Sequence, residues 1–320
     1  MENHIKIFAG NANRPLAEKI AARVGIPLSV ASIGRFPDGE ISVTYEETVR
    51  GRDVFIVQPT GMQPNEFLME LLIMADAARR ASAKRITAVV PFFAYARQDR
   101  KDRSRVPISA KLVANLLVAA GVNRVLTVDL HSPQIQGFFD IPVDHLYAAP
   151  LMVRYLREKL PAENRVVVAP DPGGLKMAYS YSQLLGAGLA LAGKHRTSAT
   201  EVEALELVGD VRGKDCVLTD DMTTTAGTLC AAAKLAKDHG AKSVRAVVSH
   251  CPITPLGIQR LKESAIEELI TTDTILPQAG WDGYAITILT VADLLGDAIK
   301  RIYGDESVSK LFEIHQGRTQ

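Results

Sequence analysis

Two adjacent carboxylates and a run of small hydroxyl residues form the segment of this chain best suited to chemistry. Asp220 and Asp221 follow an apolar, β-branched run, residues 217–219, that predicts a buried strand. Residues 223–227 then read Thr-Thr-Thr-Ala-Gly, and a helical pattern starts at Thr228. Small residues at a helix N-terminus leave backbone N–H groups free to bind a phosphate. The carboxylates suit sugar hydroxyls or a hydrated metal, so the segment indicates a site for ribose 5-phosphate or a derivative.

A strongly basic run provides a second candidate site. Residues 97–105 read Arg-Gln-Asp-Arg-Lys-Asp-Arg-Ser-Arg and follow a predicted strand, residues 86–91. Parallel α/β sheets bind ligands at the carboxyl ends of their strands, and arginine can hold a phosphate through two hydrogen bonds. The run therefore suits a polyphosphate, although a solvated charged loop is the competing interpretation.

Two further strand ends carry groups that could bind a ligand. Asp129 and His131 are two residues apart, so on a strand they would share one face and could bind a metal. Imidazole favours Zn, Mn or Fe over Mg, and a structural histidine is the alternative. Asp171 precedes Gly173 and Gly174, which allow a ligand to approach the backbone closely; a plain β-turn explains the same residues.

Two loops complete the candidates. Lys194 and Arg196 follow the predicted strand 189–192, and the residues after them lack an apolar period. This pattern predicts a mobile loop whose cations could close over a polyphosphate and neutralise charge in a phosphoryl-transfer transition state, or could simply be solvated. Residues 36–40, Phe-Pro-Asp-Gly-Glu, carry a turn signal and read most simply as the tip of a surface hairpin.

Bulk properties exclude several classes of protein. The 320 residues contain 37 Lys and Arg against 36 Asp and Glu, which argues against a nucleic-acid or membrane-surface binder. No apolar run is long enough for a membrane helix, and no signal peptide is visible. The three cysteines lack C-x-x-C spacing and are expected to be thiols in a reducing cytoplasm. Neither a P-loop nor a G-x-G-x-x-G motif is present.

Apolar strand-like runs alternate with helical patterns along the whole chain. This alternation predicts an α/β fold with mostly parallel sheets covered by helices on both faces. Residues 119–131 and 238–250 share a layout, each a helix end, a glycine and a strand ending in histidine. We therefore expect two similar domains, residues 1–147 and 148–320, although any helix–glycine–strand joint would look alike. The predicted strands cover residues 5–9, 54–58, 86–91, 125–130, 166–169, 189–192, 217–219, 244–249, 269–272 and 285–289, and the clearer helices 67–81, 109–120, 228–239 and 291–303.

Together these segments resemble class I ribose-phosphate pyrophosphokinases (phosphoribosyl diphosphate synthetases) in order and nearly in spacing. The segment Asp-Asp-x-x-x-Thr-Ala-Gly-Thr also occurs in type I phosphoribosyltransferases, but residues 97–115, 128–144 and 306–312 are similar to long signatures of the synthetases alone. The resemblance covers essentially the whole chain. It implies two type I phosphoribosyltransferase-like domains and the transfer of diphosphate from MgATP to ribose 5-phosphate, giving phosphoribosyl diphosphate and AMP.

The resemblance also implies roles for individual residues and an assembly. It implies a cytoplasmic homohexamer with two Mg²⁺ ions, inorganic phosphate as an activator, and an ATP site completed by a neighbouring subunit. The N-terminal domain would hold ATP and metal residues, and the C-terminal domain the ribose 5-phosphate loop and the catalytic loop. The implied residues are Lys194 and Arg196 for catalysis; Phe36, Asp38, Gly39, Glu40, Arg97, Gln98 and Lys101 for ATP; Arg196, Asp220, Asp221, Thr224, Thr225, Ala226, Gly227 and Thr228 for ribose 5-phosphate; His131, Asp171 and Asp129 for metal; and Ser307 and Ser309 for regulatory phosphate.

Two positions depart from the family pattern. Thr224 stands where the family usually carries Asp, which removes a carboxylate near the ribose. Met177 stands where Arg is usual, which alters the expected polyphosphate contacts. These departures leave open a non-catalytic regulatory paralogue of the same family, and the shared Asp-Asp loop leaves open a phosphoribosyltransferase.

Overall fold

The computed structural model describes residues 4–195, 204–278, 280–281 and 283–311, and the side chains of residues 194, 195, 204 and 205 are not among what it describes. The chain divides into two compact units. The first comprises residues 1–147, 274–276 and 290–313, and the second comprises residues 148–273, 277–289 and 314–320. The segment 290–313, expected with the C-terminal domain, is thus part of the first unit.

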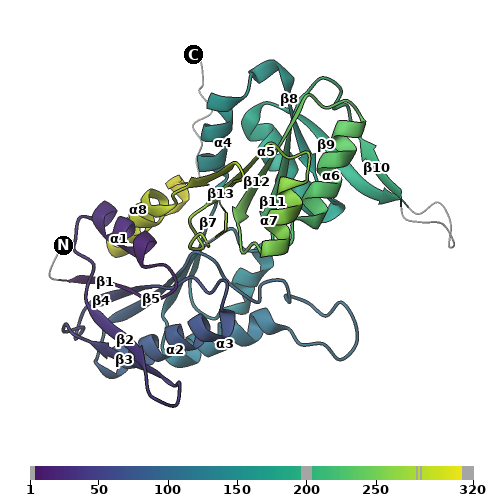
Figure 1. Ribbon diagram of the computed structural model, residues 1–320. Helices are drawn as coiled ribbons and strands as arrows, with labels where there is room; N and C mark the ends of the chain where they lie inside the picture. The colour runs from purple at the N-terminus through teal and green to yellow at the C-terminus, as the bar shows by residue number, and fades with distance from the viewer. Residues whose placement is uncertain (1–3, 196–203, 279, 282, 312–320) are drawn as a thin grey trace. The chain divides into compact units, whose positions relative to one another are not determined.

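The first unit is a parallel five-stranded sheet in the order β1-β4-β5-β6-β7 with helices on both faces (Figure 1). Helices α2 and α3 cover one face, and α1 and α8 lie side by side on the other. Strands β2 and β3 form a separate antiparallel hairpin. The strands are β1 Ile5–Ala9, β2 Ala31–Arg35, β3 Ile41–Tyr45, β4 Asp53–Val57, β5 Arg85–Val90, β6 Arg124–Val128 and β7 Val143–Leu146; the helices are α1 Arg14–Val24, α2 Pro64–Arg80, α3 Ser109–Ala120 and α8 Ala292–Tyr303, with 3₁₀ turns at Pro133–Phe138 and Ser309–Leu311.

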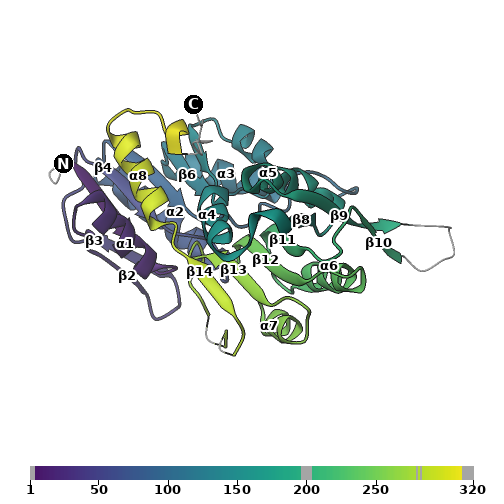
Figure 2. The same cartoon turned by 90° about the horizontal axis from the view of Figure 1, so that it is seen from above.

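The second unit is a seven-stranded sheet in the order β10-β9-β8-β11-β12-β13-β14. Only the β9–β10 pair is antiparallel among these strands. Helices α6 and α7 cover one face, and α4 and α5 the other (Figure 2). The strands are β8 Arg165–Ala169, β9 Gly188–His195, β10 Ala204–Val208, β11 Asp215–Met222, β12 Ser243–His250, β13 Glu268–Thr272 and β14 Ile286–Leu289; the helices are α4 Ala149–Lys159, α5 Leu175–Leu185, α6 Gly227–Asp238 and α7 Pro255–Lys262, with 3₁₀ turns at Ala162–Asn164 and Pro172–Gly174.

The predicted α/β class and the mostly parallel sheets are confirmed. Each predicted strand overlaps an observed strand, and α3 has the predicted bounds. The hairpin reading of residues 36–40 is also confirmed, because this segment joins β2 to β3. Helices α1, α4, α5 and α7 and strands β7 and β10 lie outside the elements expected from the sequence.

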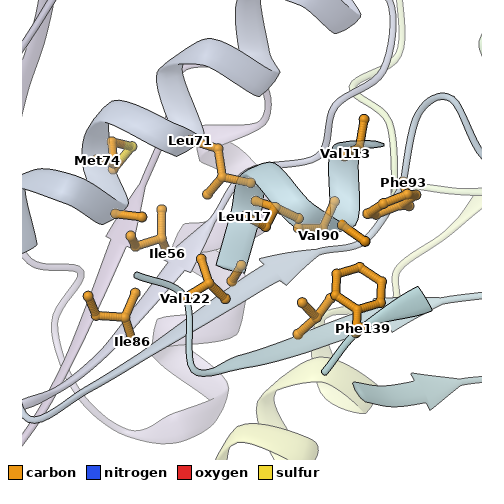
Figure 3. Packing of buried hydrophobic residues seen from close by; sticks show 14 of the residues in the cluster. Ile56, Leu71, Met74, Ile86, Val90, Phe93, Val113, Leu117, Val122 and Phe139 are labelled. Atoms are coloured by element: carbon orange, nitrogen blue, oxygen red, sulfur yellow. The ribbon is translucent and has the colours of Figure 1, made fainter. Parts of the chain in front are cut away.

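The apolar residues that recur along the strands, α2 and α3 of the first unit pack together in its core. Leu117 on α3 is 1% exposed and packs with Leu71, Ile86 and Val122 in one buried cluster (Figure 3). Alternating strand residues point to this cluster, whereas their neighbours point to the opposite face under α1 and α8. Both faces of the sheet are therefore apolar, as parallel sheets require.

Leu117→Ala is expected to lower the free energy of unfolding by about 3 kcal/mol, because truncation removes buried area and leaves a cavity. Denaturant unfolding measures this change. The neighbouring Leu116 is 38% exposed, and Leu116→Ala is the matched control, expected to cost less than about 1 kcal/mol. Equal losses in the two variants would contradict this view of the core.

Within the described ranges, no helix combines the length and apolar character needed to cross a bilayer. All three cysteines of the chain, Cys216, Cys230 and Cys251, are free thiols. Burial raises the pKa of each thiol, which keeps it protonated and unreactive at neutral pH.

Candidate functional site

The carboxyl edge of the second sheet brings together Asp171, Asp220, Asp221 and the backbone of Lys194. Strands β9, β8 and β11 are parallel neighbours, so their carboxyl ends meet at one edge. Lys194 lies near the end of β9, Asp171 follows β8, and Asp220 and Asp221 lie near the end of β11. The chain leaves β8 for β9 on one side and returns to β11 on the other. This reversal is a topological switch point, where α/β sheets form ligand-binding crevices.

The two carboxylates form a tightly coupled pair. They lie inside β11, which continues to Met222, rather than after the strand as expected. Burial first, then the charges of Asp221 and Asp171, raise the pKa of Asp220 to about 8. Asp220 Oδ1 accepts a hydrogen bond from the Asp221 N–H at 2.9 Å. Three carboxylates thus share one electrostatic environment that favours a cation or hydroxyl donors.

Residues 223–228 form the loop between β11 and α6, here called the anion loop. Helix α6 begins at Gly227, one residue before the predicted start, and its N-cap Ala226 has a left-handed backbone with φ 54° and ψ 9°. Left-handed residues at such turns help successive N–H groups to converge on an anion. The first N–H groups of a helix have no acceptor within the helix. Thr224, Thr225, Ala226, Gly227 and Thr228 therefore lie in a backbone geometry suited to a phosphate.

Asp171 begins a tight turn beside this edge. Its carboxylate accepts a hydrogen bond from the Gly174 N–H at 3.0 Å, and residues 172–174 form a 3₁₀ turn that leads into α5. Asp171 is exposed, so it is available to a ligand. Met177, on the first turn of α5, is partly buried against the apolar cluster under α4 and α5. This residue fills a packing position.

In the first unit, the basic run lies in the connection between β5 and α3, as expected from a strand end. Arg97, Gln98 and Lys101 are all exposed. The side-chain oxygen of Gln98 accepts a hydrogen bond from the Ser109 hydroxyl. The backbone carbonyl of Gln98 accepts one from the Ala110 N–H at 3.2 Å. These contacts tie the run to the start of α3.

The Asp129–His131 segment differs from the prediction. Strand β6 ends at Val128, and Asp129 has a left-handed φ of 37°, so the expectation that both side chains share a strand face is wrong. The segment is instead a turn whose Leu130 N–H donates to Nε2 of buried His145 at 2.9 Å. Asp129 and His131 belong to the first unit, whereas Asp171 belongs to the second.

Among the described residues, no group of three or more His, Cys, Asp or Glu side chains has the geometry of a metal site. Carboxylate oxygens nevertheless fit Mg²⁺, which commonly takes one or two carboxylates together with waters and substrate phosphates. Asp171, Asp220 and Asp221 provide this donor chemistry.

The β2–β3 hairpin presents its tip to solvent. Phe36 is 54% exposed, an unusual state for a large apolar side chain. The tip is ordered by hydrogen bonds from the Gly39 N–H to the Phe36 carbonyl at 2.9 Å and from the Glu40 N–H to Asp38 at 3.2 Å. Arg35 donates to the Gly39 carbonyl at 2.8 Å and pairs with Glu66 of α2.

The remaining predicted residues are Ser307, Ser309, Lys194 and Arg196. Ser307 and Ser309 are exposed beyond α8, where Arg301 donates to the Ser307 carbonyl at 3.2 Å and the Ser307 hydroxyl accepts from the Ser309 N–H at 3.3 Å. Arg196 lies outside the described residues, and of Lys194 only the backbone, paired with Leu205, is described.

Sequence reasoning missed the residues that support these turns. Thr254 and Arg260 of the α7 region contact the anion loop, and His145 contacts the 129–131 turn. Thr254 followed by Pro255 is a helix-start signal that could have revealed α7. Nothing in the sequence links Arg260 to a loop 35 residues earlier.

Comparisons with known proteins agree with this geometry. Residues 5–121 match the model of the N-terminal domain of ribose phosphate pyrophosphokinase, and residues 195–313 match the phosphoribosyl synthetase-associated domain. The chain is 51% identical to a ribose-phosphate pyrophosphokinase of Clostridium perfringens, covering 98% of this chain and 100% of the relative. It is 50% identical to one of Marinomonas sp., covering 96% and 98%.

A solved structure of a related enzyme has the same fold as this chain. The phosphoribosylpyrophosphate synthetase of Mycobacterium smegmatis is 42% identical and aligns over 95% of this chain and 100% of that chain, with a TM-score of 0.90. The family resemblance inferred from the motifs is confirmed. The chain is an enzyme of the ribose-phosphate pyrophosphokinase family.

Proposed function

We propose that the chain transfers the diphosphoryl group of MgATP to the anomeric hydroxyl of ribose 5-phosphate. The observation that supports this best is the anion loop beside paired carboxylates at a switch point of the sheet, in a chain about half identical to named ribose-phosphate pyrophosphokinases. The 5-phosphate binds the N–H groups of residues 225–228, and the ribose hydroxyls donate to Asp220 and Asp221.

In the reaction, the anomeric oxygen attacks the β-phosphorus of ATP, and its proton is released to solvent water. A new oxygen–phosphorus bond forms, the bond between the β-phosphorus and the bridging oxygen to the α-phosphate breaks, and AMP leaves with that oxygen. Positioning and charge neutralisation carry most of such a reaction. Lys194 and Arg196 supply cations at the transferring group, and Arg97, Gln98 and Lys101 bind ATP.

Mg²⁺, when bound, neutralises part of the phosphate charge. In this proposal Asp171, His131 and Asp129 hold the metal, with a second ion in the full complex. The charges of Asp221 and Asp171, which raise the pKa of the partly buried Asp220, support a cation in this region. Inorganic phosphate is proposed as an activator at Ser307 and Ser309, two exposed residues of which Ser307 accepts a hydrogen bond from Arg301 through its backbone carbonyl.

The proposal includes a cytoplasmic homohexamer. Exposed apolar side chains support self-association: Met69 on α2 is 51% exposed, and Leu112 on α3 is 57% exposed. In the hexamer, Phe36, Asp38, Gly39 and Glu40 reach the ATP of a neighbouring subunit, which explains why Phe36 is exposed on an ordered tip. Three free thiols fit a reducing compartment.

A coupled assay of AMP release, with and without ribose 5-phosphate, tests the proposed function. The expected result is ribose-dependent AMP together with phosphoribosyl diphosphate. A regulatory paralogue would release no AMP under these conditions, and a phosphoribosyltransferase would instead consume phosphoribosyl diphosphate with a base. Absence of ribose-dependent AMP from folded protein would therefore refute the proposal.

A further inference from the structure

The anion loop is supported from behind by α7, the helix that follows β12. The Thr224 carbonyl accepts hydrogen bonds from the Thr254 N–H at 2.9 Å and from the Thr254 hydroxyl at 3.2 Å. The next carbonyl, of Thr225, accepts one from Nη1 of Arg260 at 3.2 Å. Two successive carbonyls of the loop are therefore held by one neighbouring helix and its N-cap.

The direction of these carbonyls determines the direction of the loop's N–H groups. In a planar trans peptide the C=O and the following N–H point in opposite directions, and the described residues contain no cis peptide bond. Because the Thr224 and Thr225 carbonyls point towards Thr254 and Arg260, the N–H groups of Thr225 and Ala226 point away from them. Those N–H groups belong to the set proposed to bind the 5-phosphate.

The packing between the loop and α7 leaves little space for other arrangements. A Cβ added to Gly257 would lie 2.8 Å from the Thr224 carbonyl oxygen and 2.5 Å from Cγ1 of Ile253. A Cβ on Gly227 would lie 3.2 Å from Nη1 of Arg260. The thiol of Cys230, on the first turns of α6, donates to the Arg260 carbonyl at 3.6 Å. The backbone of Arg260 on α7 is therefore held by Cys230 of α6, while its side chain reaches the Thr225 carbonyl of the loop.

We propose that Arg260, assisted by Thr254, is a positioning residue that orients the backbone N–H groups of the anion loop for the phosphate of ribose 5-phosphate. This inference rests on the proposed function. Arg260 acts through the Thr225 carbonyl, and its role is to hold the loop in its binding geometry before the substrate arrives. Preorganised donors avoid the cost of ordering the loop during binding.

The test compares Arg260→Met with Lys234→Met, using calorimetric binding of ribose 5-phosphate and steady-state kinetics. Lys234 is a matched control, because it is a 76% exposed cation on α6 that pairs with Asp238 and does not hold the loop. Arg260→Met is expected to raise the Kd and KM for ribose 5-phosphate about tenfold, equivalent to about 1.4 kcal/mol. The KM for ATP and the thermal midpoint should change little, and Lys234→Met should leave all four quantities near the wild-type values.

Gly257→Ala separates orientation from charge, since it adds no charge and its Cβ presses on the Thr224 carbonyl. It is expected to raise the Kd for ribose 5-phosphate by a similar factor. The inference is overturned if Arg260→Met behaves as Lys234→Met does, if both substrates weaken together with a loss of stability, or if folded Gly257→Ala binds ribose 5-phosphate normally. Failure of the proposed function is distinguishable, because wild-type protein would then show no ribose-dependent AMP.

Discussion

Replacing Lys194 with alanine is expected to lower kcat about 10³-fold, while the thermal midpoint stays within about 2 °C of the wild-type value. Cations placed at a transferring phosphoryl group contribute factors of about 10³–10⁵ to turnover, because they stabilise charge that develops in the transition state. The thermal midpoint should hold because β9 and β10 are joined by backbone pairing at Lys194 and Leu205, which alanine retains. Steady-state kinetics and thermal unfolding of the same preparation measure both quantities.

Lys84 provides the control for this prediction. It is an exposed lysine in the turn before β5, remote in sequence from every predicted site segment. Lys84→Ala should leave kcat unchanged. A large fall in the thermal midpoint of Lys194→Ala, with turnover preserved, would show that Lys194 is structural and would contradict its catalytic role.

Asp220→Asn is expected to stabilise the protein and to impair its use of ribose 5-phosphate. Because burial and the charges of Asp221 and Asp171 raise the pKa of Asp220 to about 8, the folded state binds more protons than the unfolded state from about pH 4 to pH 8. The free energy of unfolding of the wild type therefore falls as pH rises through this window. Asparagine does not ionise, so the advantage of the variant should grow with pH and exceed about 2 kcal/mol near pH 8.

The same substitution removes an acceptor for the ribose hydroxyls. Above about pH 8, where Asp220 is ionised, hydrogen bonds to its charged carboxylate are worth about 1.5–3 kcal/mol, so kcat/KM for ribose 5-phosphate measured there should fall about 10²-fold. Asp238→Asn on the exposed end of α6 is the control, expected to be neutral in both measurements. Denaturant unfolding at pH 4, 6 and 8 tests the stability effect. A stability difference that does not vary with pH would show that Asp220 is not held in its protonated form.

The elements predicted from the sequence are those whose local pattern of apolar residues matches their burial in the folded protein. The sheet strands are short β-branched apolar runs, and their pattern persists because both faces of a parallel sheet are buried. Helix α3 has the predicted bounds, and its C-terminal end is marked in the sequence by Gly121, which supplies a left-handed C-cap with φ 107°. Helix α5 was missed because its Tyr, Ser and Gln residues blur the apolar period, and eight-residue α7 is too short to show one.

Residue type and spacing were enough to name Asp220, Asp221 and the anion loop as candidates, whereas the contacts that support the loop could not be read from the sequence. The two adjacent acids and the small residues that follow them indicate a ligand site by their types and spacing alone. The left-handed backbone of Asp129 and the contact of Arg260 with the Thr225 carbonyl depend on segments far apart in the chain. No local pattern encodes such contacts, which explains why the strand geometry expected for Asp129 and His131 was wrong.

The pairing of α1 with α8 has a consequence for the order in which the protein forms. Arg23 holds Asp297 through two hydrogen bonds of 2.8 and 2.7 Å, and Leu295 and Ile299 of α8 are fully buried. The first unit begins at the start of the chain yet needs residues near its end. During synthesis, α1 alone covers its face of the sheet until α8 has followed residues 148–289, whose strands and helices can already form the core of the second unit. Nascent chains stalled before α8 should therefore bind chaperones through the apolar surface of the first unit that α8 would cover.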